Sequence, residues 1–283
     1  MNALAEAGPT EVPAQASAVA EAGPLLMLRL IPDMTALGRW VAATGQRALR
    51  DDAGYALHAA LRATLGQYAP KPFALLQRPG SEQLIGYSTQ PLPELMQAIE
   101  QGPITDPGAA RALGLDRPGD VVIKPMPGIW ASGQALSFEA RVAPVVRSRT
   151  AAGPGGAYPE IDAAFHPEFA SDTPGDRAAA HGRWLAKELA RGSAATLQTH
   201  RAVAFQLAPM ARRNQRAQGN QPGSPQQRAP RDTHNGLLPD LTVRGQLRVD
   251  DASAFNHLLA RGLGRHRSFG FGCLLLAPAG AWS

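Results

Sequence analysis

The sequence has a single cysteine among its 283 residues, Cys273, which lies in the apolar run FGCLLL. An intrachain disulfide is therefore excluded, and a reducing compartment is expected. The seven histidines are scattered, and no C-x-x-C, H-E-x-x-H, H-x-H or D-x-D-x-D-G motif occurs. No G-x-S-x-G motif occurs either. The sequence thus predicts no bound metal ion and no triad hydrolase.

Long apolar runs and early basic residues are also absent. No apolar stretch is long enough to span a membrane, and the first 28 residues contain no Lys or Arg, which a secretory signal peptide needs near its start. We therefore expect a cytoplasmic protein with no membrane partner.

Lysine is scarce, because only three of the 28 basic residues are Lys (Lys71, Lys124 and Lys187) and the other 25 are Arg. Residues 1–23 carry three acidic and no basic residues, so the rest of the chain has 28 basic against 20 acidic residues. The base composition of a genome can produce this preference for Arg. Arginine also suits phosphate, because its planar guanidinium donates parallel hydrogen bonds, and the expected partner is therefore a polyanion.

The first half of the chain has the pattern of one small α+β domain. Residues 1–23 are rich in Ala, Glu and Pro and are predicted to form a disordered acidic tail. In the helix expected over 51–66, Leu57, Leu61 and Leu65 form an apolar stripe that Gly66 ends. The other elements predicted here are strands over 25–31, 73–78, 83–88 and 120–126 and helices over 35–50 and 93–102.

The second half repeats this order, with strands over 135–149, 195–208, 240–250 and 268–278 and helices over 178–192 and 250–262. The predicted fold class is therefore α+β, with two tandem ferredoxin-like (βαββαβ) domains over 24–132 and 133–283. Two stretches do not fit and are predicted insertions, 150–176 and 211–236. The second is expected to be a flexible cationic loop, because it is rich in Gln, Asn, Gly and Pro and contains Arg212, Arg213 and Arg216.

A basic, glycine-rich run precedes the final strand: ARGLGRHRSFGFGCLLLAPAG, residues 260–280. A dinucleotide-binding fingerprint needs a strand before its glycines and a helix after them, and here the order is reversed. No Walker-type motif occurs, so no nucleotide cofactor is expected. Gly262 alone is best explained as a helix cap. The whole run favours a surface of backbone N–H groups and arginines that binds phosphate.

Tyr55 and His58 are the strongest candidates for proton transfer. They lie three residues apart on one helix and therefore on one face, while the leucine stripe points another way. A histidine that titrates near neutrality beside a phenol is a suitable pair for moving protons at an RNA 2′-hydroxyl. A histidine that merely packs at the helix edge is the alternative for His58 taken alone.

The run GYALHAALRATLG resembles the first-helix signature of the CasE branch of the CRISPR repeat endoribonucleases, members of the RAMP superfamily. The strand ALSFEARVAPVVRSR resembles the mid-chain strand of that family, and ARGLGRHRSFGFGCLLLAP resembles its C-terminal glycine-rich loop and strand. The resemblance covers roughly residues 24–278 in consistent order. It implies tandem ferredoxin-like domains and a metal-independent endoribonuclease without a cofactor.

The resemblance also implies the substrate and the site. The protein would bind the CRISPR repeat RNA hairpin, cleave precursor crRNA to mature crRNA and stay bound beside other Cas subunits of an effector complex. His58 would be the general acid or base and Tyr55 its partner. The expected RNA-binding residues are the loop glycines with basic residues of the loop and of other segments: Gly262, Gly264, Arg265, His266, Arg267, Gly270, Gly272, Arg47, Arg50, Arg147, Arg149, Arg212, Arg213 and Arg216.

The acidic tail, the helix over 35–50 and the two insertions depart from an ordinary CasE and suggest a diverged homologue, such as one from a type IV system. In such a protein arginines can take over the stabilisation of the transition state. Arg29, Arg39 and Arg265 are the candidates, chosen by their position in the chain.

A second function remains open, that of a non-catalytic RNA-binding subunit of a ribonucleoprotein. RSFGFGCL, residues 267–274, nearly matches the RNP1 motif, with Phe269 and Phe271 as stacking residues. Its position argues against this interpretation, because an RNP1 strand is followed by a helix and another strand, whereas this chain ends nine residues later.

Overall fold

The computed structural model describes residues 24–45, 52–78, 81–117, 119, 121–147, 159–171, 173, 176–212 and 234–282. The predicted tail over 1–23 lies outside these ranges, as does most of the predicted cationic loop. Five of the predicted RNA-binding residues also lie outside them, namely Arg47, Arg50, Arg149, Arg213 and Arg216.

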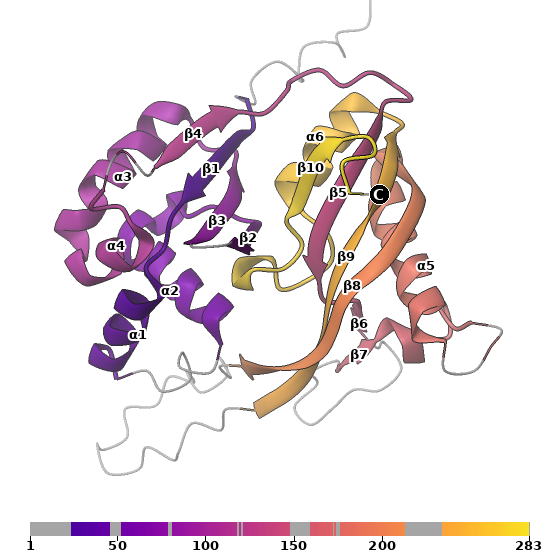
Figure 1. The fold of residues 1–283 in the computed structure, drawn as a ribbon, viewed down its shortest axis with the longest axis horizontal. Coiled ribbons are helices and arrows are strands. Elements are labelled where there is room, and N and C mark those ends of the chain that lie inside the picture. Colours follow the sequence, from indigo (N-terminus) through magenta and orange to yellow (C-terminus); the bar gives the residue numbers. More distant parts are fainter. Residues whose placement is uncertain are drawn as a thin grey trace, which may run out of the picture.

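The first domain is a four-stranded antiparallel sheet with four helices (Figure 1). The strand order is β2-β3-β1-β4. The strands are β1 (Leu26–Leu30), β2 (Phe73–Arg78), β3 (Ser81–Ser88) and β4 (Val122–Pro125). The helices are α1 (Met34–Ala43), α2 (Ala53–Leu65), α3 (Leu92–Thr105) and α4 (Pro107–Leu113), and the turn η2 (Gly66–Tyr68) follows α2.

The second domain is also a four-stranded antiparallel sheet, in the order β10-β5-β9-β8. Its strands are β5 (Ala135–Val142), β8 (Ala195–Arg212), β9 (His234–Val249) and β10 (Leu274–Pro278), and its helices are α5 (Arg177–Ala190) and α6 (Ala252–Arg261). A small hairpin of β6 (Val145–Arg147) and β7 (Glu160–Asp162) precedes α5. Short turns complete the domain, η5 (Ala163–Phe165), η6 (Arg191–Ser193) and η8 (Arg267–Phe269).

Numbered within each domain, both sheets have the strand order 4-1-3-2, which is the ferredoxin-like arrangement. The predicted fold class is therefore confirmed. In the described part of the chain, no helix is both long and apolar enough to cross a membrane.

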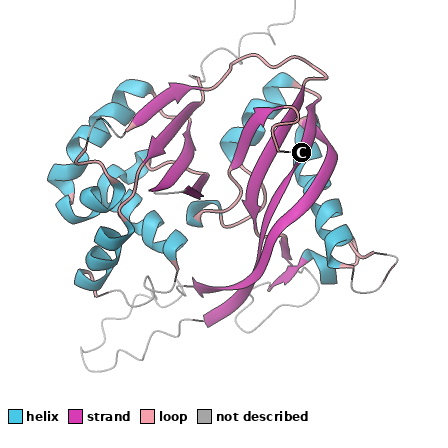
Figure 2. Ribbon diagram, viewed as in Figure 1, coloured by secondary structure: helices cyan, strands magenta, loops and turns pink. Residues whose placement is uncertain are grey.

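The two faces of the first sheet pack against different partners. Leu28 and Leu30 of β1 are buried in one cluster with Leu57 and Leu61 of α2, as the leucine stripe predicts. Figure 1 shows α1, α3 and α4 on the outer side of this sheet, away from the second domain, whereas α2 also contacts the turn η8 of that domain, and Figure 2 gives the same view by secondary structure. The opposite face belongs to the core of the second domain, because Tyr87 packs there and its hydroxyl donates to the Leu274 carbonyl oxygen, 2.8 Å away. The domains thus share a core across their boundary.

Several predicted elements have different limits in the structure. The predicted strand over 135–149 breaks between Val142 and Val145, where the chain leaves the sheet to form β6. The helix predicted over 35–50 is described as Met34–Ala43. Within the predicted insertion over 150–176, residues 160–165 form β7 and η5, so part of this stretch is regular structure. The stretch predicted as a loop over 211–236 begins and ends in strands, because β8 runs to Arg212 and β9 starts at His234.

Helix α4 was not predicted, although its signals are present. Asp106 caps its N-terminus, with a side-chain oxygen 2.9 Å from the backbone nitrogen of Ala109, and Pro107 takes the first helical position. Gly114 ends the helix in the left-handed region.

The predicted strand over 268–278 is wrong in its first half. Strand β10 starts only at Leu274, and Arg267–Phe269 form the turn η8. Gly272 has a φ of +75°, which lies outside regular strand geometry, and its N–H donates to the Arg141 carbonyl oxygen outside the regular ladder. The glycine-rich segment, residues 262–273 and hereafter the glycine-rich loop, is therefore longer than expected.

Candidate active site

The N-terminal end of α2 carries the predicted proton-transfer pair. Asp52 caps the helix, with a side-chain oxygen 2.9 Å from the backbone nitrogen of Tyr55. The leucines of α2 are buried in the first domain, and the face that carries Tyr55 and His58 is turned to the glycine-rich loop of the second domain. The ring centroid of Phe269 lies 5.3 Å from that of Tyr55 and 5.2 Å from that of His58. The Phe269 ring thus contacts the rings of both Tyr55 and His58.

The close approach of α2 and the loop depends on a glycine. A Cβ atom on Gly54 would lie 2.1 Å from the carbonyl oxygen of Phe269, well inside van der Waals contact. Only a residue without a side chain lets the helix come this near to the loop backbone.

His58 is half-buried, and its surroundings favour the neutral imidazole. Burial lowers the pKa of His58 below its ordinary value of 6.5, and the positive charges of Arg62 and Lys71 lower this pKa further. The side chain is therefore neutral at pH 7 and able to accept a proton.

The glycine-rich loop is closed by backbone hydrogen bonds. Gly262 ends α6, and its N–H donates to the Leu258 carbonyl oxygen, 2.7 Å away, so this residue is a helix cap as predicted. The N–H of Leu263 donates to the Gly272 carbonyl oxygen across the loop, 2.8 Å away. The backbone of the loop is thereby fixed at its base.

Two carboxylates from the second domain bind the loop. Glu160 of β7 accepts a hydrogen bond from Arg265 Nε at 2.8 Å, and its other oxygen lies 2.8 Å from His266 Nε2. Glu188 of α5 accepts a hydrogen bond from the backbone N–H of Gly264 at 3.0 Å. Arg265 and His266, which were predicted to bind RNA, are thus both paired with the carboxylate of Glu160.

The C-terminal part of the loop packs on a half-buried ion pair. Arg141 donates two hydrogen bonds of 2.8 Å to Asp240, and its guanidinium carbon lies 4.4 Å from the centroid of the Phe271 ring. Phe271 is only 4% exposed. The RNP1 interpretation is therefore wrong in its geometry, because Phe271 is covered and Phe269 lies in a turn against α2, so neither offers a stacking surface on a strand.

The arginines proposed as catalytic do not form one cluster with His58. Arg29 lies on β1 facing away from Leu28 and Leu30, and its Nε atom is buried without a hydrogen-bond partner among the described residues. Arg39 is exposed on α1. The cations whose charges act on His58 are Arg62 and Lys71.

Sequence reasoning therefore missed Arg62, Lys71 and Glu160. Arg62 had a signal, because it lies one helical turn after His58. Lys71 and Glu160 had none, since only the packing of distant segments brings them to the site. Among the described residues, no group of three or more His, Cys, Asp or Glu side chains is placed to hold a metal ion.

Comparison with protein families finds a family model that matches most of the chain. The family model described as CRISPR associated protein matches residues 27–278. No curated protein matches the sequence.

Solved structures with a similar fold have low sequence identity to this chain. The Thermus thermophilus Cse3 structure bound to an RNA representing a pre-cleavage complex is 17% identical, with a TM-score of 0.53 over 90% of this chain and 100% of that one. A structure of the CRISPR endoribonuclease Cse3 bound to a 19-nucleotide RNA is 17% identical, with a TM-score of 0.55 over 91% and 100% of the two chains. A chain of a CRISPR RNA-guided surveillance complex is 16% identical, with a TM-score of 0.50 over 89% and 99%.

Proposed function

This chain belongs to the CRISPR-associated protein family, and on that premise we propose that it binds the hairpin of a CRISPR repeat RNA and cleaves the precursor RNA beside that hairpin. The observation that carries the proposal is the contact of Tyr55 and His58 with Phe269 of the glycine-rich loop. The Cse3 structures of similar fold hold RNA, which supports an RNA substrate. The Cse3 structures are only 17% identical in sequence to this chain, so the proposed reaction rests on the residues of this chain itself.

The proposed reaction uses the RNA's own 2′-hydroxyl as the nucleophile. Neutral His58 accepts the proton of that hydroxyl, the oxygen forms a bond to the adjacent phosphorus, and the bond from phosphorus to the 5′-oxygen breaks. The leaving 5′-oxygen takes a proton from the Tyr55 phenol. The products are a 2′,3′-cyclic phosphate and a 5′-hydroxyl. The charges of Arg62 and Lys71 favour the anionic transition state by opposing its negative charge.

Shape and phosphate contacts are expected to dominate the recognition of the hairpin. The major groove of an A-form stem is too narrow and deep for side chains to read. Arg147, Arg265 and Arg267 are the proposed phosphate-binding arginines among the described residues. Because a chain of similar fold is part of a surveillance complex, we further propose that this protein stays bound to its product as a subunit of such a complex.

The cleavage assay that tests this function is done in excess chelator with a CRISPR repeat hairpin RNA that the protein binds. Cutting should proceed at an undiminished rate, because the nucleophile is the substrate's hydroxyl and needs no activation by a metal ion. The 3′ end of the upstream product should be a cyclic phosphate. Activity that returns only with a divalent ion, or a 3′ end without the cyclic phosphate, refutes the mechanism. Tight binding without any cutting indicates a non-catalytic RNA-binding subunit instead.

Hairpin affinity should fall steeply as the salt concentration rises. Each phosphate that the protein neutralises releases condensed cations, so a plot of log affinity against log salt should have a slope of about −0.7 to −0.9 per phosphate. Filter binding between about 50 and 300 mM salt measures this slope, with the Arg147→Ala variant as a check that one contact lowers it by about one phosphate's share. An affinity that does not respond to salt contradicts the proposed mode of binding.

A further inference from the structure

The carboxylate of Glu160, on strand β7, is buried against the glycine-rich loop and is shared between two loop side chains. One of its oxygens accepts a hydrogen bond from Arg265 Nε, and the other lies 2.8 Å from His266 Nε2. The side chain of Glu160 is only 7% exposed, and that of His266 only 10%. A buried carboxylate with a partner at each oxygen fixes the geometry of both partners, which an exposed ion pair does not.

His266 has a backbone conformation that needs such support. Its φ is +61°, in the left-handed region, which is uncommon for a residue with a Cβ atom. This conformation begins the turn η8, in which the N–H of Phe269 donates to the His266 carbonyl oxygen, 2.8 Å away. The contact of the His266 side chain with Glu160 therefore stabilises the turn that carries Phe269.

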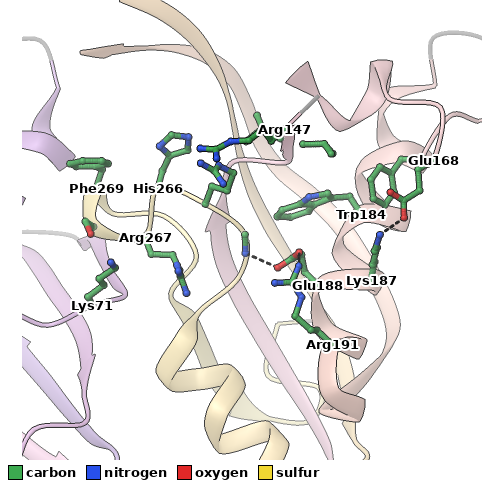
Figure 3. Close-up of a pocket in the computed structure, with 16 residues that line it drawn as sticks. Lys71, Arg147, Glu168, Trp184, Lys187, Glu188, Arg191, His266, Arg267 and Phe269 are labelled. Atoms are coloured by element: carbon green, nitrogen blue, oxygen red, sulfur yellow. Dashed lines mark hydrogen bonds and ion pairs between the residues drawn. The ribbon is translucent and has the colours of Figure 1, made fainter. Parts of the chain in front are cut away.

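The turn η8 connects Glu160 to the candidate active site. Figure 3 shows the His266 side chain between Phe269 and Arg147, and the ring centroids of His266 and Phe269 are 6.4 Å apart. Phe269 also contacts the rings of Tyr55 and His58. A change of conformation at His266 thus moves the ring against which His58 packs.

Glu160 also orients an arginine that is proposed to bind phosphate. It uses only Nε of Arg265, and in the described part of the chain the terminal nitrogens Nη1 and Nη2 of this arginine have no hydrogen-bond partner. Arg147 is opposite Glu160 in the register of the β6–β7 hairpin. Arg147 and Arg265 line one cavity with Lys71 of the first domain. The terminal nitrogens of Arg265 are therefore held where a phosphate can reach them.

We propose that Glu160 is a positioning residue of the proposed reaction. Through His266 it holds Phe269 against His58. Through Nε of Arg265 it presents the terminal nitrogens of that arginine to a phosphate of the RNA. This inference rests on the proposed function. Removal of the negative charge of Glu160 should then weaken the binding of a polyanion, which is the opposite of what charge alone predicts.

The test measures single-turnover cleavage at saturating hairpin RNA, and affinity for a hairpin with a 2′-deoxy nucleotide at the cleavage position. The variants are Glu160→Ala, Glu160→Asp and Glu160→Gln. Glu168→Ala is the matched control, because Glu168 is a carboxylate of the same domain whose side chain pairs with Lys187 of α5 and not with the loop. It should cleave at the wild-type rate and bind at least as tightly as the wild type, because a negative charge is removed.

Glu160→Ala should show two losses. Cleavage should be slower by roughly tenfold to a hundredfold, because His58 is misplaced. Hairpin binding should be weaker by about threefold to tenfold, because the released Arg265 side chain must be ordered again on binding. The inference is overturned if Glu160→Ala binds as tightly as Glu168→Ala or cleaves at the wild-type rate.

Glu160→Asp and Glu160→Gln separate reach from charge. The aspartate keeps the charge but is one methylene shorter and cannot hold both partners, so it should show the same two losses, and it replaces Glu160→Ala if that variant does not fold. The glutamine can accept from Arg265 Nε and donate to His266 Nε2 when that ring carries its proton on Nδ1, so it should recover most of both losses. The reverse order, with aspartate near the wild type and glutamine defective, overturns the inference.

A measurement without RNA separates this inference from the proposed function. The imidazole signals of His58, assigned with His58→Ala, are followed by NMR in the full chain. They should shift in Glu160→Ala and Glu160→Asp but not in Glu168→Ala, because the Phe269 ring, centred 5.2 Å from that of His58, moves. His58 signals that stay in place in the Glu160 variants overturn the inference, whatever the RNA does. If they shift but the wild type neither binds nor cuts the hairpin, the proposed function is refuted and the positioning of His58 by Glu160 is kept.

Discussion

Replacing His58 with alanine should slow cleavage of the repeat hairpin by roughly two to four orders of magnitude and leave hairpin affinity nearly unchanged. A proton-transfer group acts on the barrier more than on binding, and His58 is neutral at pH 7 and therefore able to take the proton. Tyr55→Phe should cost less, because water can supply a proton to the leaving oxygen. Single-turnover rates measure the effect. His257→Ala is the matched control, because His257 is exposed on α6 and lies outside the site.

The pH dependence gives the same hypothesis a second readout. The wild-type rate should rise with pH through an apparent pKa below 6.5 and then level off, because burial and the charges of Arg62 and Lys71 lower the pKa of His58. Below that pKa the imidazole is protonated and cannot act as a base. His58→Ala should lose the rise, and Lys71→Met should move it to higher pH, because a positive charge is removed.

If His58→Ala slows cleavage only mildly, catalysis depends on positive charges that stabilise the transition state and not on proton transfer by His58. In that case alanine at Arg62 or Lys71, the cations whose charges act on His58, should be severe, because a charge-assisted contact to the transition state is lost. Near-wild-type rates in all three alanine variants would refute both mechanisms.

Gly54→Ala should slow cleavage by about a hundredfold while the protein stays folded, because a misplacement of about 1 Å can cost this much in rate. The new Cβ atom would lie 2.1 Å from the Phe269 carbonyl oxygen, so α2 and the glycine-rich loop must move apart. The loop cannot simply yield, since its base is closed by the hydrogen bond from Leu263 to Gly272. His58 is then displaced relative to the loop.

Gly38→Ala is the control for this substitution. Gly38 lies in α1 with no atom within 4 Å of an added Cβ, so alanine there should raise stability by up to about 1 kcal/mol and leave the rate unchanged. Thermal melting and single-turnover rates are measured on both variants. A Gly54→Ala rate within about twofold of the wild type would show that the contact between helix and loop does not position the site.

Prediction from sequence worked best where the spacing of apolar residues within one helix or strand indicates which of its residues are buried. The leucines of α2 repeat at helical spacing and are buried as this spacing predicts, and the strand predicted over 25–31 is present as β1, in which Leu26, Leu28 and Leu30 are buried. Both elements can be recognised from residues close together in the sequence. The order of such elements was sufficient for the ferredoxin-like fold, since few topologies connect them with short, right-handed crossings.

Prediction failed where the backbone conformation differs from the one that the pattern of side chains indicates. The apolar run over 268–278 has the composition of a strand, but positive φ angles at Gly270 and Gly272 interrupt it. Phe269 and Phe271 alternate in sequence like residues of a sheet face, yet one contacts α2 and the other packs under Arg141.

The sequence by itself determined the fold class, the helix that carries Tyr55 and His58, and the position of the glycine-rich loop, because helical and strand periodicities are local. Only the tertiary structure decided which other residues these side chains contact. Glu160 reaches Arg265 and His266 from more than one hundred positions away along the chain, and Lys71 of the first domain shares a cavity with Arg147 of the second. A charged side chain has no periodicity that identifies its partner, so its partner is set by how the two domains pack.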